Sequence, residues 1–299
     1  MSEADLIARI RELFPRTGDD AAMIGDQVIT NDMLIEDVDF KRDVPLRLIA
    51  RKSLAVNLSD LAAMGAKPQF ALVAIGAPAW VNVRELVEEF ANAARERRVE
   101  IIGGDLSRAE KLTISITAIG EAKQPLLRSG AHAGERLYVS RPLGGSAAGL
   151  ALLDKNLDSM PYSQREFAES AIRHHLDPEP EVDLGMKLVG IATSCIDISD
   201  GLSTDVHHLC DASNAGADIA RERIPIFPGL LDSGLNVRDL VLNGGEEFAL
   251  LFTSAVRESE ISAKVGRPVY MIGRMTKERG VRLDGAPLEP RGFDHFARR

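Results

Sequence analysis

Strand-like and helix-like segments alternate along this chain, and their order limits the folds available to it. The apolar runs at 68–78 (PQFALVAIGAP) and 99–104 (VEIIGG) are typical of buried strands. Residues 83–98 lie between them and have the periodicity of a helix, and 111–122 (KLTISITAIGEA) predicts a further strand. Because strands follow each other both with and without a helix between them, we expect a mixed sheet and an α/β or α+β fold class.

The length of 299 residues favours two domains. A turn-rich stretch at 123–135 separates two halves that each contain helices and strands, so we place domains at 1–125 and 126–299. Helices are expected in the first half at 3–13 and from Pro45 to Gly65. The second half predicts an α/β domain, with strands at 136–140, 194–199, 217–220, 247–253 and 268–273 and helices at 144–153, 163–175, 181–190 and 200–213.

The charge and the composition exclude several classes of protein. A net charge of −9, from 45 acidic and 36 basic residues, leaves no broad positive surface, so we expect neither nucleic acid nor a membrane as a partner. Two cysteines are too few for a disulfide framework, and the N-terminus lacks the apolar core of a signal peptide. The most apolar stretch, 70–81, is shorter than a membrane span. These features favour a soluble cytoplasmic protein.

Acidic residues gather where the expected strands and helices end. They are Asp19, Asp20, Asp32, Asp60, Asp105, Asp197, Asp200 and Glu246. Two carboxylates 4 Å apart repel by about 4 kcal/mol at an effective dielectric of 20, so several that converge need a cation. Mg²⁺ prefers oxygen ligands and phosphates, and it would also allow an acidic chain to bind an anionic substrate. The alternative is that each Asp only caps a helix or forms a turn.

The motif CIDISDGL at 195–202 is the most specific of these candidate sites. A strand ends there, and Asp197 and Asp200 stand three residues apart, so both could face a metal–phosphate group while Ser199 donates a hydrogen bond. In the alternative interpretation, Ser199 or Asp200 is only the N-cap of the next helix.

A Gly-rich turn in RPLGGSAAGLALL (141–153) enters a helix whose free amides favour an anion. The turn matches neither a P-loop nor a Rossmann motif, so the signal for phosphate is weak. The pairs His174–His175 and His207–His208 are adjacent, and adjacent residues do not share a helix face, which argues against metal ligation by either pair. We find no local pattern for a catalytic nucleophile or base.

Eight segments together resemble the thiamine-monophosphate kinase family, which belongs to the superfamily of aminoimidazole ribotide synthetase and selenophosphate synthetase. They occur in the family's order across nearly the whole chain: GDDAAMI, TNDMLIEDVDF, SLAVNLSDLAAMGAKP, IIGGDLSR, RSGAHAGERLYVS, DISDGLSTDVHHL, NGGEEFALLFT and RGFDHF. Each segment alone is weak evidence for the family, whereas all eight in this order are specific to it.

The resemblance implies transfer of the γ-phosphoryl group of ATP to thiamine monophosphate, with several Mg²⁺ ions, in a homodimer whose N-terminal domains pair. By position, it implies metal ligands at Asp20, Thr30, Asn31, Asp32, Asp60, Asp105, Asp197 and Asp200. It implies ATP contacts at Arg128 and Ser199 and substrate contacts at Asp39, Glu246 and Phe293. Asp39 departs from the family, which usually has a His there. The acceptor is already a phosphate oxyanion, so positioning and charge neutralisation can suffice without a catalytic base.

The resemblance also changes how the acidic stretch 17–40 is interpreted. The stretch carries seven acidic side chains and no Lys or Arg. We expect Asp20 and Asp32 to bind metal and Asp26, Glu36 and Asp37 to be solvated turn residues. Two other functions stay open: a different ATP-using enzyme of the superfamily with another small-molecule substrate, and a non-catalytic nucleotide- or thiamine-phosphate-binding protein.

Overall fold

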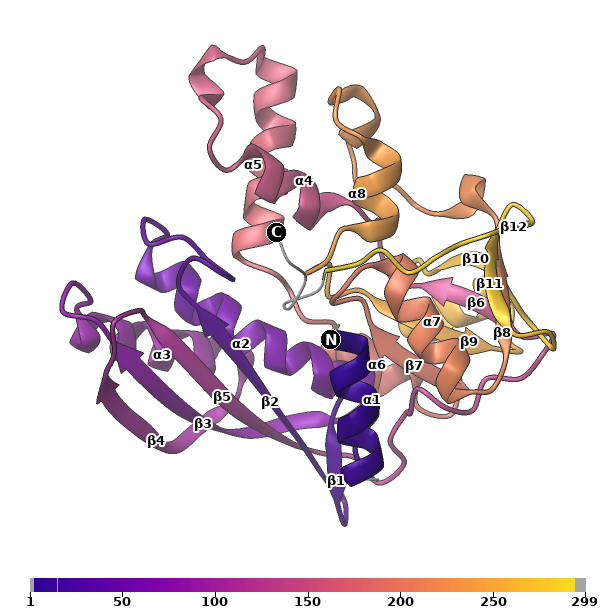
Figure 1. Cartoon of the computed structure of the whole chain (residues 1–299), viewed down its shortest axis with the longest axis horizontal. Coiled ribbons are helices and arrows are strands. Elements are labelled where there is room, and N and C mark those ends of the chain that lie inside the picture. The colour runs from indigo at the N-terminus through magenta and orange to yellow at the C-terminus, as the bar shows by residue number, and fades with distance from the viewer. Residues whose placement is uncertain (1–2, 15, 294–299) are drawn as a thin grey trace.

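The computed structural model describes residues 3–14 and 16–293, so residues 294–296 of the RGFDHF segment lie outside the described part. The N-terminal half contains α1 (Glu3–Leu13), β1 (Ala22–Ile24), β2 (Gln27–Ile35), α2 (Leu46–Ala63), β3 (Lys67–Ala77), α3 (Val83–Arg97), β4 (Glu100–Arg108) and β5 (Thr113–Glu121). The strands form one sheet in the order β1-β2-β5-β3-β4, and α2 and α3 cover one of its faces (Figure 1). β3 and β4 are parallel because α3 crosses between them, whereas the other pairs are antiparallel.

The predicted mixed sheet is therefore confirmed, but the sequence pattern missed the short strand β1 and the longer strand β2. Of the two, β2 carries site residues. The inward positions of β2 alternate regularly, but they include Thr30 and Asp32 among apolar residues, which hides the period of two. One expectation in this stretch was wrong. Glu36 is buried rather than solvated, and its Oε2 accepts a hydrogen bond from the Leu112 amide at 2.9 Å.

The C-terminal half is built on a second mixed sheet, which confirms the α/β fold class with two domains. It contains β6 (Arg136–Val139), α4 (Gly145–Leu152), α5 (Tyr162–Leu176), α6 (Val182–Leu188), β7 (Ser194–Asp197), α7 (Leu202–Ala212), β8 (Gly216–Ile219), α8 (Val237–Asn243), β9 (Leu250–Ser254), α9 (Glu258–Val265), β10 (Tyr270–Thr276), β11 (Gly280–Leu283) and β12 (Ala286–Pro287). The strand order is β12-β11-β8-β10-β6-β9-β7, and helices α4, α5 and α8 stand together at one end of this half (Figure 1). The sequence pattern did not predict α8, α9, β11 or β12.

The two halves meet along α2. Gly185 of α6 lies so close to this helix that a Cβ there would meet the Ala62 carbonyl oxygen at 2.0 Å. Phe248, from the second half, is buried in the hydrophobic core of the first. Both contacts bring α2 and its polar side chains against the C-terminal half. None of the helices in the described residues combines the length and the apolar character that a bilayer crossing needs.

Candidate active site

Three aspartates from distant parts of the chain converge where the two halves meet. Asp20 precedes β1, Asp60 lies on α2 and Asp197 ends β7, and one carboxylate oxygen of each lies within 4.8 Å of the others. The Asp20 side chain has no exposed surface. Its Oδ1 binds Arg128 at 2.8 Å, whereas its Oδ2 has no hydrogen-bond partner among the described residues. The sequence therefore predicted these carboxylates, and the fold brings them together.

Helix α2 positions much of this cluster through residues three or four apart. The Asn57 side chain accepts a hydrogen bond from the Asp32 amide at 2.9 Å and donates to the Ser53 carbonyl at 3.0 Å, which fixes β2 against the helix. The Thr30 hydroxyl donates to Asp60, and the Ser59 hydroxyl donates to Asp197. Thr30 and Asp32 lie on the same face of β2 because strand side chains alternate.

Burial and mutual repulsion disfavour the ionised form of these acids. Burial, followed by the charge of Asp20, raises the pKa of Asp197 to about 8. Burial, followed by the charge of Asp39, raises the pKa of Asp32 to about 6. The pKa values of Asp20 and Asp60 are also raised, chiefly by burial. Burial works against the charged Arg128 guanidinium, but Asp20, Asp197 and Asp205 together outweigh it and raise the pKa of Arg128.

The donor set fits a hard divalent cation. Carboxylate oxygens are the ligands that Mg²⁺ prefers, and Asp20 has a buried Oδ2 without a hydrogen-bond partner among the described residues, in a group of like charges. One Arg cannot neutralise three converging carboxylates. Asp20, Asp60 and Asp197 could therefore hold Mg²⁺, with Thr30 and Asp32 beside them.

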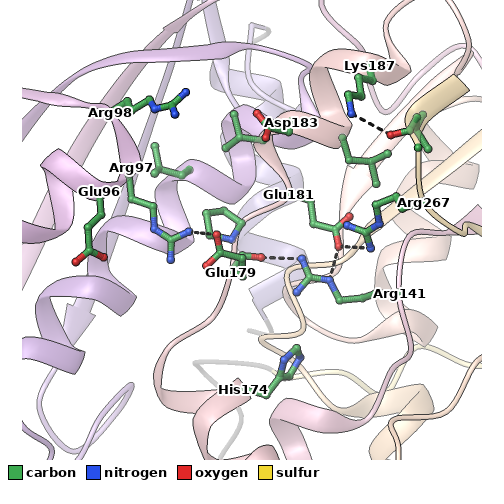
Figure 2. Close-up of a pocket in the computed structure, with 16 residues that line it drawn as sticks. Glu96, Arg97, Arg98, Arg141, His174, Glu179, Glu181, Asp183, Lys187 and Arg267 are labelled. Atoms are coloured by element: carbon green, nitrogen blue, oxygen red, sulfur yellow. Dashed lines mark hydrogen bonds and ion pairs between the residues drawn. The ribbon is translucent and has the colours of Figure 1, made fainter.

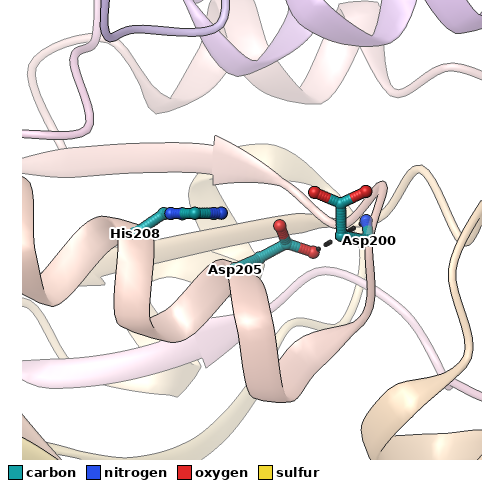
Figure 3. Close-up of side chains that lie close together, drawn as sticks. All are labelled: Asp200, Asp205 and His208. Carbon is teal, nitrogen blue, oxygen red and sulfur yellow. Dashed lines mark hydrogen bonds between the residues drawn. The ribbon is translucent and has the colours of Figure 1, made fainter. Parts of the chain in front are cut away.

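A second group contains Asp200, Asp205 and His208, whose ligand atoms also lie within 4.8 Å of one another (Figure 3). Asp205 was not predicted from the sequence. Its Oδ2 accepts hydrogen bonds from the amides of Asp200 at 3.2 Å and Gly201 at 3.0 Å. Gly201 is the N-cap of α7, so the alternative in which Ser199 or Asp200 caps this helix was wrong. Burial, with the charge of Arg128, lowers the pKa of His208 to about 4, which keeps its imidazole neutral and able to ligate.

The loop 244–248 brings two neighbouring carboxylates to the other side of the site. Glu246 and Phe248 have positive φ angles of 58° and 49°, which are rare for such residues. The Glu246 amide donates to the Ser199 carbonyl at 2.7 Å, and the Phe248 amide donates to the Ile198 carbonyl at 2.8 Å. This pairing holds Glu246 beside the DISDG segment.

Glu247, which the sequence did not single out, occupies the Gly-rich turn. Its Oε1 accepts hydrogen bonds from the amides of Gly144 at 3.0 Å and Ser146 at 2.9 Å, at the start of α4. The anion expected at this turn is therefore a carboxylate of the protein. The adjacent histidines contact successive acids: His174 lies 3.2 Å from Glu247 and His175 lies 3.3 Å from Glu246.

Two predicted metal ligands stand apart from the cluster. The Asn31 side chain is on the opposite face of β2, where it bonds Thr117 at 2.9 Å and Ser115 at 3.1 Å. Asp105 is exposed on the edge strand β4, and it accepts a hydrogen bond from Ser107 at 3.0 Å. Within the described chain, neither side chain reaches the group formed by Asp20, Asp60 and Asp197.

Asp39 and Phe293, which the sequence predicts as substrate contacts, lie in segments near the acidic groups, and the charge of Asp39 acts on Asp32. The Asp39 carboxylate accepts a hydrogen bond from the Ile35 amide at 2.7 Å, so it also closes the turn after β2. The backbone amide of Phe293 donates to the Asp200 carbonyl at 3.2 Å, and its side chain is 42% exposed. These contacts place both residues next to segments that carry proposed metal ligands.

A separate cleft of about 830 Å³ lies between the end of α3 and helix α6 (Figure 2). None of the residues predicted to bind metal, ATP or substrate lines it. Ion pairs cross it: Arg97 binds Glu179, while Arg141 and Arg267 share Glu181 (Figure 2). This cleft is therefore distinct from the carboxylate site.

Comparison with known proteins first defines the class. Residues 18–122 match the family described as AIR synthase related protein, N-terminal domain, and residues 132–285 match AIR synthase related protein, C-terminal domain. The fold and its acidic site thus define a two-domain AIR synthase-related protein.

Closer relatives then identify the family. A thiamine-monophosphate kinase of Buchnera aphidicola (subsp. Acyrthosiphon pisum) is 35% identical and covers 93% of this chain and 91% of its own length. One from Aquifex aeolicus is 33% identical and covers 93% and 92%. The solved structure described as AaThiL complexed with AMPPCP and TMP has a TM-score of 0.89 at 31% identity, over 99% of this chain and 97% of the other. The chain belongs to the thiamine-monophosphate kinase family.

Proposed function

We propose that this protein transfers the γ-phosphoryl group of ATP to thiamine monophosphate, giving thiamine diphosphate and ADP. The observation that carries the proposal is the buried cluster of Asp20, Asp60 and Asp197 in a chain of this family. A related structure was solved with AMPPCP and TMP, that is, with an ATP analogue and a substrate together.

The residues suit a reaction that needs positioning rather than proton abstraction. The attacking group is a phosphate oxygen that is already ionised, and the described residues near the cluster offer acids and one Arg. Mg²⁺ held by Asp20, Asp60 and Asp197 would neutralise phosphate charge and align the reacting groups. Arg128, kept cationic and oriented by Asp20, would contact ATP, with Ser199 as a second contact.

Glu246, Asp39 and Phe293 are our proposed contacts for thiamine monophosphate. The carboxylate of Glu246 is held by an ion pair with Lys52 on one oxygen and by a contact with the His175 imidazole on the other, and it is still 31% exposed, so it can accept a further hydrogen bond. The face of the Phe293 ring would attract the cationic thiazolium by about 0.5–2 kcal/mol. Asp39 would supply a second negative charge to the substrate, in addition to that of Glu246.

The direct test combines purified protein, ATP, Mg²⁺ and thiamine monophosphate and measures thiamine diphosphate by chromatography. We expect product with wild type and a loss of at least 100-fold, about 3 kcal/mol, with Asp60→Asn, because a charged ligand is lost. Tight ATP binding without product would favour the non-catalytic binding protein. Product from another phosphorylated acceptor alone would favour a different enzyme of the superfamily.

We further propose a homodimer that forms through the N-terminal sheet. Among the described residues, β4 pairs only with β3, and residues 30–35 of β2 pair on one side only. Exposed apolar side chains lie on the same sheet: Met33, Leu72, Ile102 and Leu106. Open strand edges and exposed apolar side chains both favour association with a second copy.

The dimer would also account for Asp105. Across the sheet, Asp105 pairs with Ala74, Ala74 pairs with Ser115, and Ser115 pairs with Met33. Three strand spacings, roughly 14 Å in all, therefore separate Asp105 from Met33 of the same copy. We propose that β4 pairs with the free edge of β2 in the second copy in the register that sets Asp105 beside residues 31 and 32 of that copy. Co-expression of Asp60→Asn and Asp105→Asn should then restore about a quarter of wild-type activity, because mixed dimers contain one intact site. Activity no higher than that of either variant alone would contradict this arrangement.

We also propose a domain boundary at 125/126 and a cytoplasmic location. The two family matches, which end at 122 and begin at 132, support the boundary. Limited proteolysis between those positions would test it.

A further inference from the structure

Lys52 is a buried cation on α2 that neither the sequence motifs nor the metal cluster explains. Only 2% of its surface is exposed. Its Nζ lies 2.7 Å from Oε1 of Glu246 and donates a hydrogen bond to the Asp39 carbonyl at 3.1 Å. One ammonium group therefore contacts two of the three residues that we assign to the substrate.

These contacts join segments that the chain keeps far apart. Asp39 follows β2 and Lys52 lies on α2, both in the N-terminal half, whereas Glu246 lies in the loop 244–248 of the other half. His175 binds the second oxygen of Glu246 at 3.3 Å, and the same ring nitrogen lies 3.0 Å from the Ser146 hydroxyl. The Glu246 carboxylate is thus held between a group from each half of the protein.

We propose that Lys52 is a positioning residue for thiamine monophosphate: it orients the Glu246 carboxylate and fixes the Asp39 turn, so that both present acceptors at one fixed spacing. This inference rests on the proposed function. It assigns Lys52 no contact with ATP or with the metal cluster.

The energetics indicate that Lys52 is not needed for folding. Burying an ammonium costs free energy that one ion pair does not reliably repay, and replacement of a buried ion by an apolar side chain is often neutral when no buried charge is left behind. Here the remaining partner, Glu246, is 31% exposed, so water can solvate it. Loss of Lys52 should therefore affect the geometry of the acceptors more than the stability of the fold.

The test compares Lys52→Met with Arg51→Met. Arg51 is the next residue on α2 and also joins the two halves, through Asp177 at 2.7 Å, but it lies outside the substrate contacts. For Lys52→Met we expect the KM for thiamine monophosphate to rise about tenfold or more, as for loss of a hydrogen bond to a charged group. The KM for ATP should stay within about twofold and the melting temperature should stay near that of wild type. Arg51→Met should leave both KM values unchanged.

A double-mutant cycle tests whether Lys52 acts through Glu246. In a Glu246→Gln background, Lys52→Met should raise the KM for thiamine monophosphate by clearly less than it does in wild type. If Lys52→Met folds poorly, Lys52→Gln retains a neutral donor, and the same split between the two substrates is expected.

Three results would overturn the proposal: equal increases in both KM values, an effect of Arg51→Met as large as that of Lys52→Met, or independent effects in the cycle. If wild type makes no product, the proposed reaction fails, but calorimetric binding of thiamine monophosphate in the presence of AMPPCP still tests Lys52. A tenfold loss of that affinity in Lys52→Met would support the inference, and an unchanged or absent affinity would overturn it.

Discussion

The carboxylate cluster makes stability depend on pH and on Mg²⁺ in a calculable way. The ligand atoms of Asp20, Asp60 and Asp197 lie within 4.8 Å, so each ionised pair repels by at least about 3 kcal/mol at an effective dielectric of 20. Arg128 offsets part of this at 2.8 Å from Asp20. Without a metal ion, the folded protein therefore retains protons on these acids, with the pKa of Asp197 raised to about 8.

The free energy of unfolding decreases with pH because the pKa values of these acids are raised on folding. An acid whose pKa is raised on folding binds more protons in the folded than in the unfolded state, so the free energy of unfolding falls as pH rises. The fall begins near the unfolded pKa, about 4. It ends near pH 6 for Asp32 and near pH 8 for Asp197. Each proton involved contributes about 1.4 kcal/mol per pH unit.

Thermal unfolding between pH 5 and pH 8.5, with EDTA or with excess Mg²⁺, measures this effect. We expect the melting temperature to fall with pH in EDTA and much less in Mg²⁺, because the cation replaces the protons. Stabilisation by Mg²⁺ at 100 times its Kd is about 2.7 kcal/mol. Stabilisation by Mg²⁺ that is the same at every pH would refute the reasoning.

Two variants sharpen the measurement. Asp197→Asn removes one titrating group, so it should flatten the pH dependence in EDTA and weaken stabilisation by Mg²⁺. Asp26→Asn is the matched control, because Asp26 is an exposed carboxylate in the turn between β1 and β2. Identical pH profiles for Asp197→Asn and wild type would show that Asp197 does not titrate as described.

Three further predictions concern other parts of the molecule. Asp39→His should lower the KM for thiamine monophosphate by restoring the family's usual imidazole. It should also lower the free energy of unfolding by about 1 kcal/mol, because the Ile35 amide loses its acceptor. An unchanged or higher KM would mean that this chain binds the substrate well with Asp39 in place of the imidazole. Ile102→Asp should shift sedimentation from dimer to monomer, since Ile102 is 51% exposed on the edge strand β4; a persistent dimer would exclude this edge as the interface. Gly185→Ala should lower the free energy of unfolding by about 1–3 kcal/mol in denaturant melts, because its Cβ would meet the Ala62 carbonyl; full stability would mean that α6 can shift.

Much of the fold followed from local patterns. The run 68–78 became β3 at Lys67–Ala77, and the helix expected from Pro45 to Gly65 became α2 at Leu46–Ala63. These elements are long and strongly patterned, so local sequence decides them. β2 was missed because the site itself interrupts its pattern: Thr30 and Asp32 take inward positions that an ordinary strand fills with apolar residues.

By itself, the sequence determined the family, the order of the elements and the acidic residues available to a metal, because these depend on residue type and on spacing along the chain. Only the tertiary structure decided which residues meet. It set Asn31 on the opposite face from Asp32, filled the Gly-rich turn with Glu247, and placed Lys52 against Glu246. Such contacts join positions as much as 194 residues apart in the chain. They arise from the packing of α2 between the two halves, which no local pattern records.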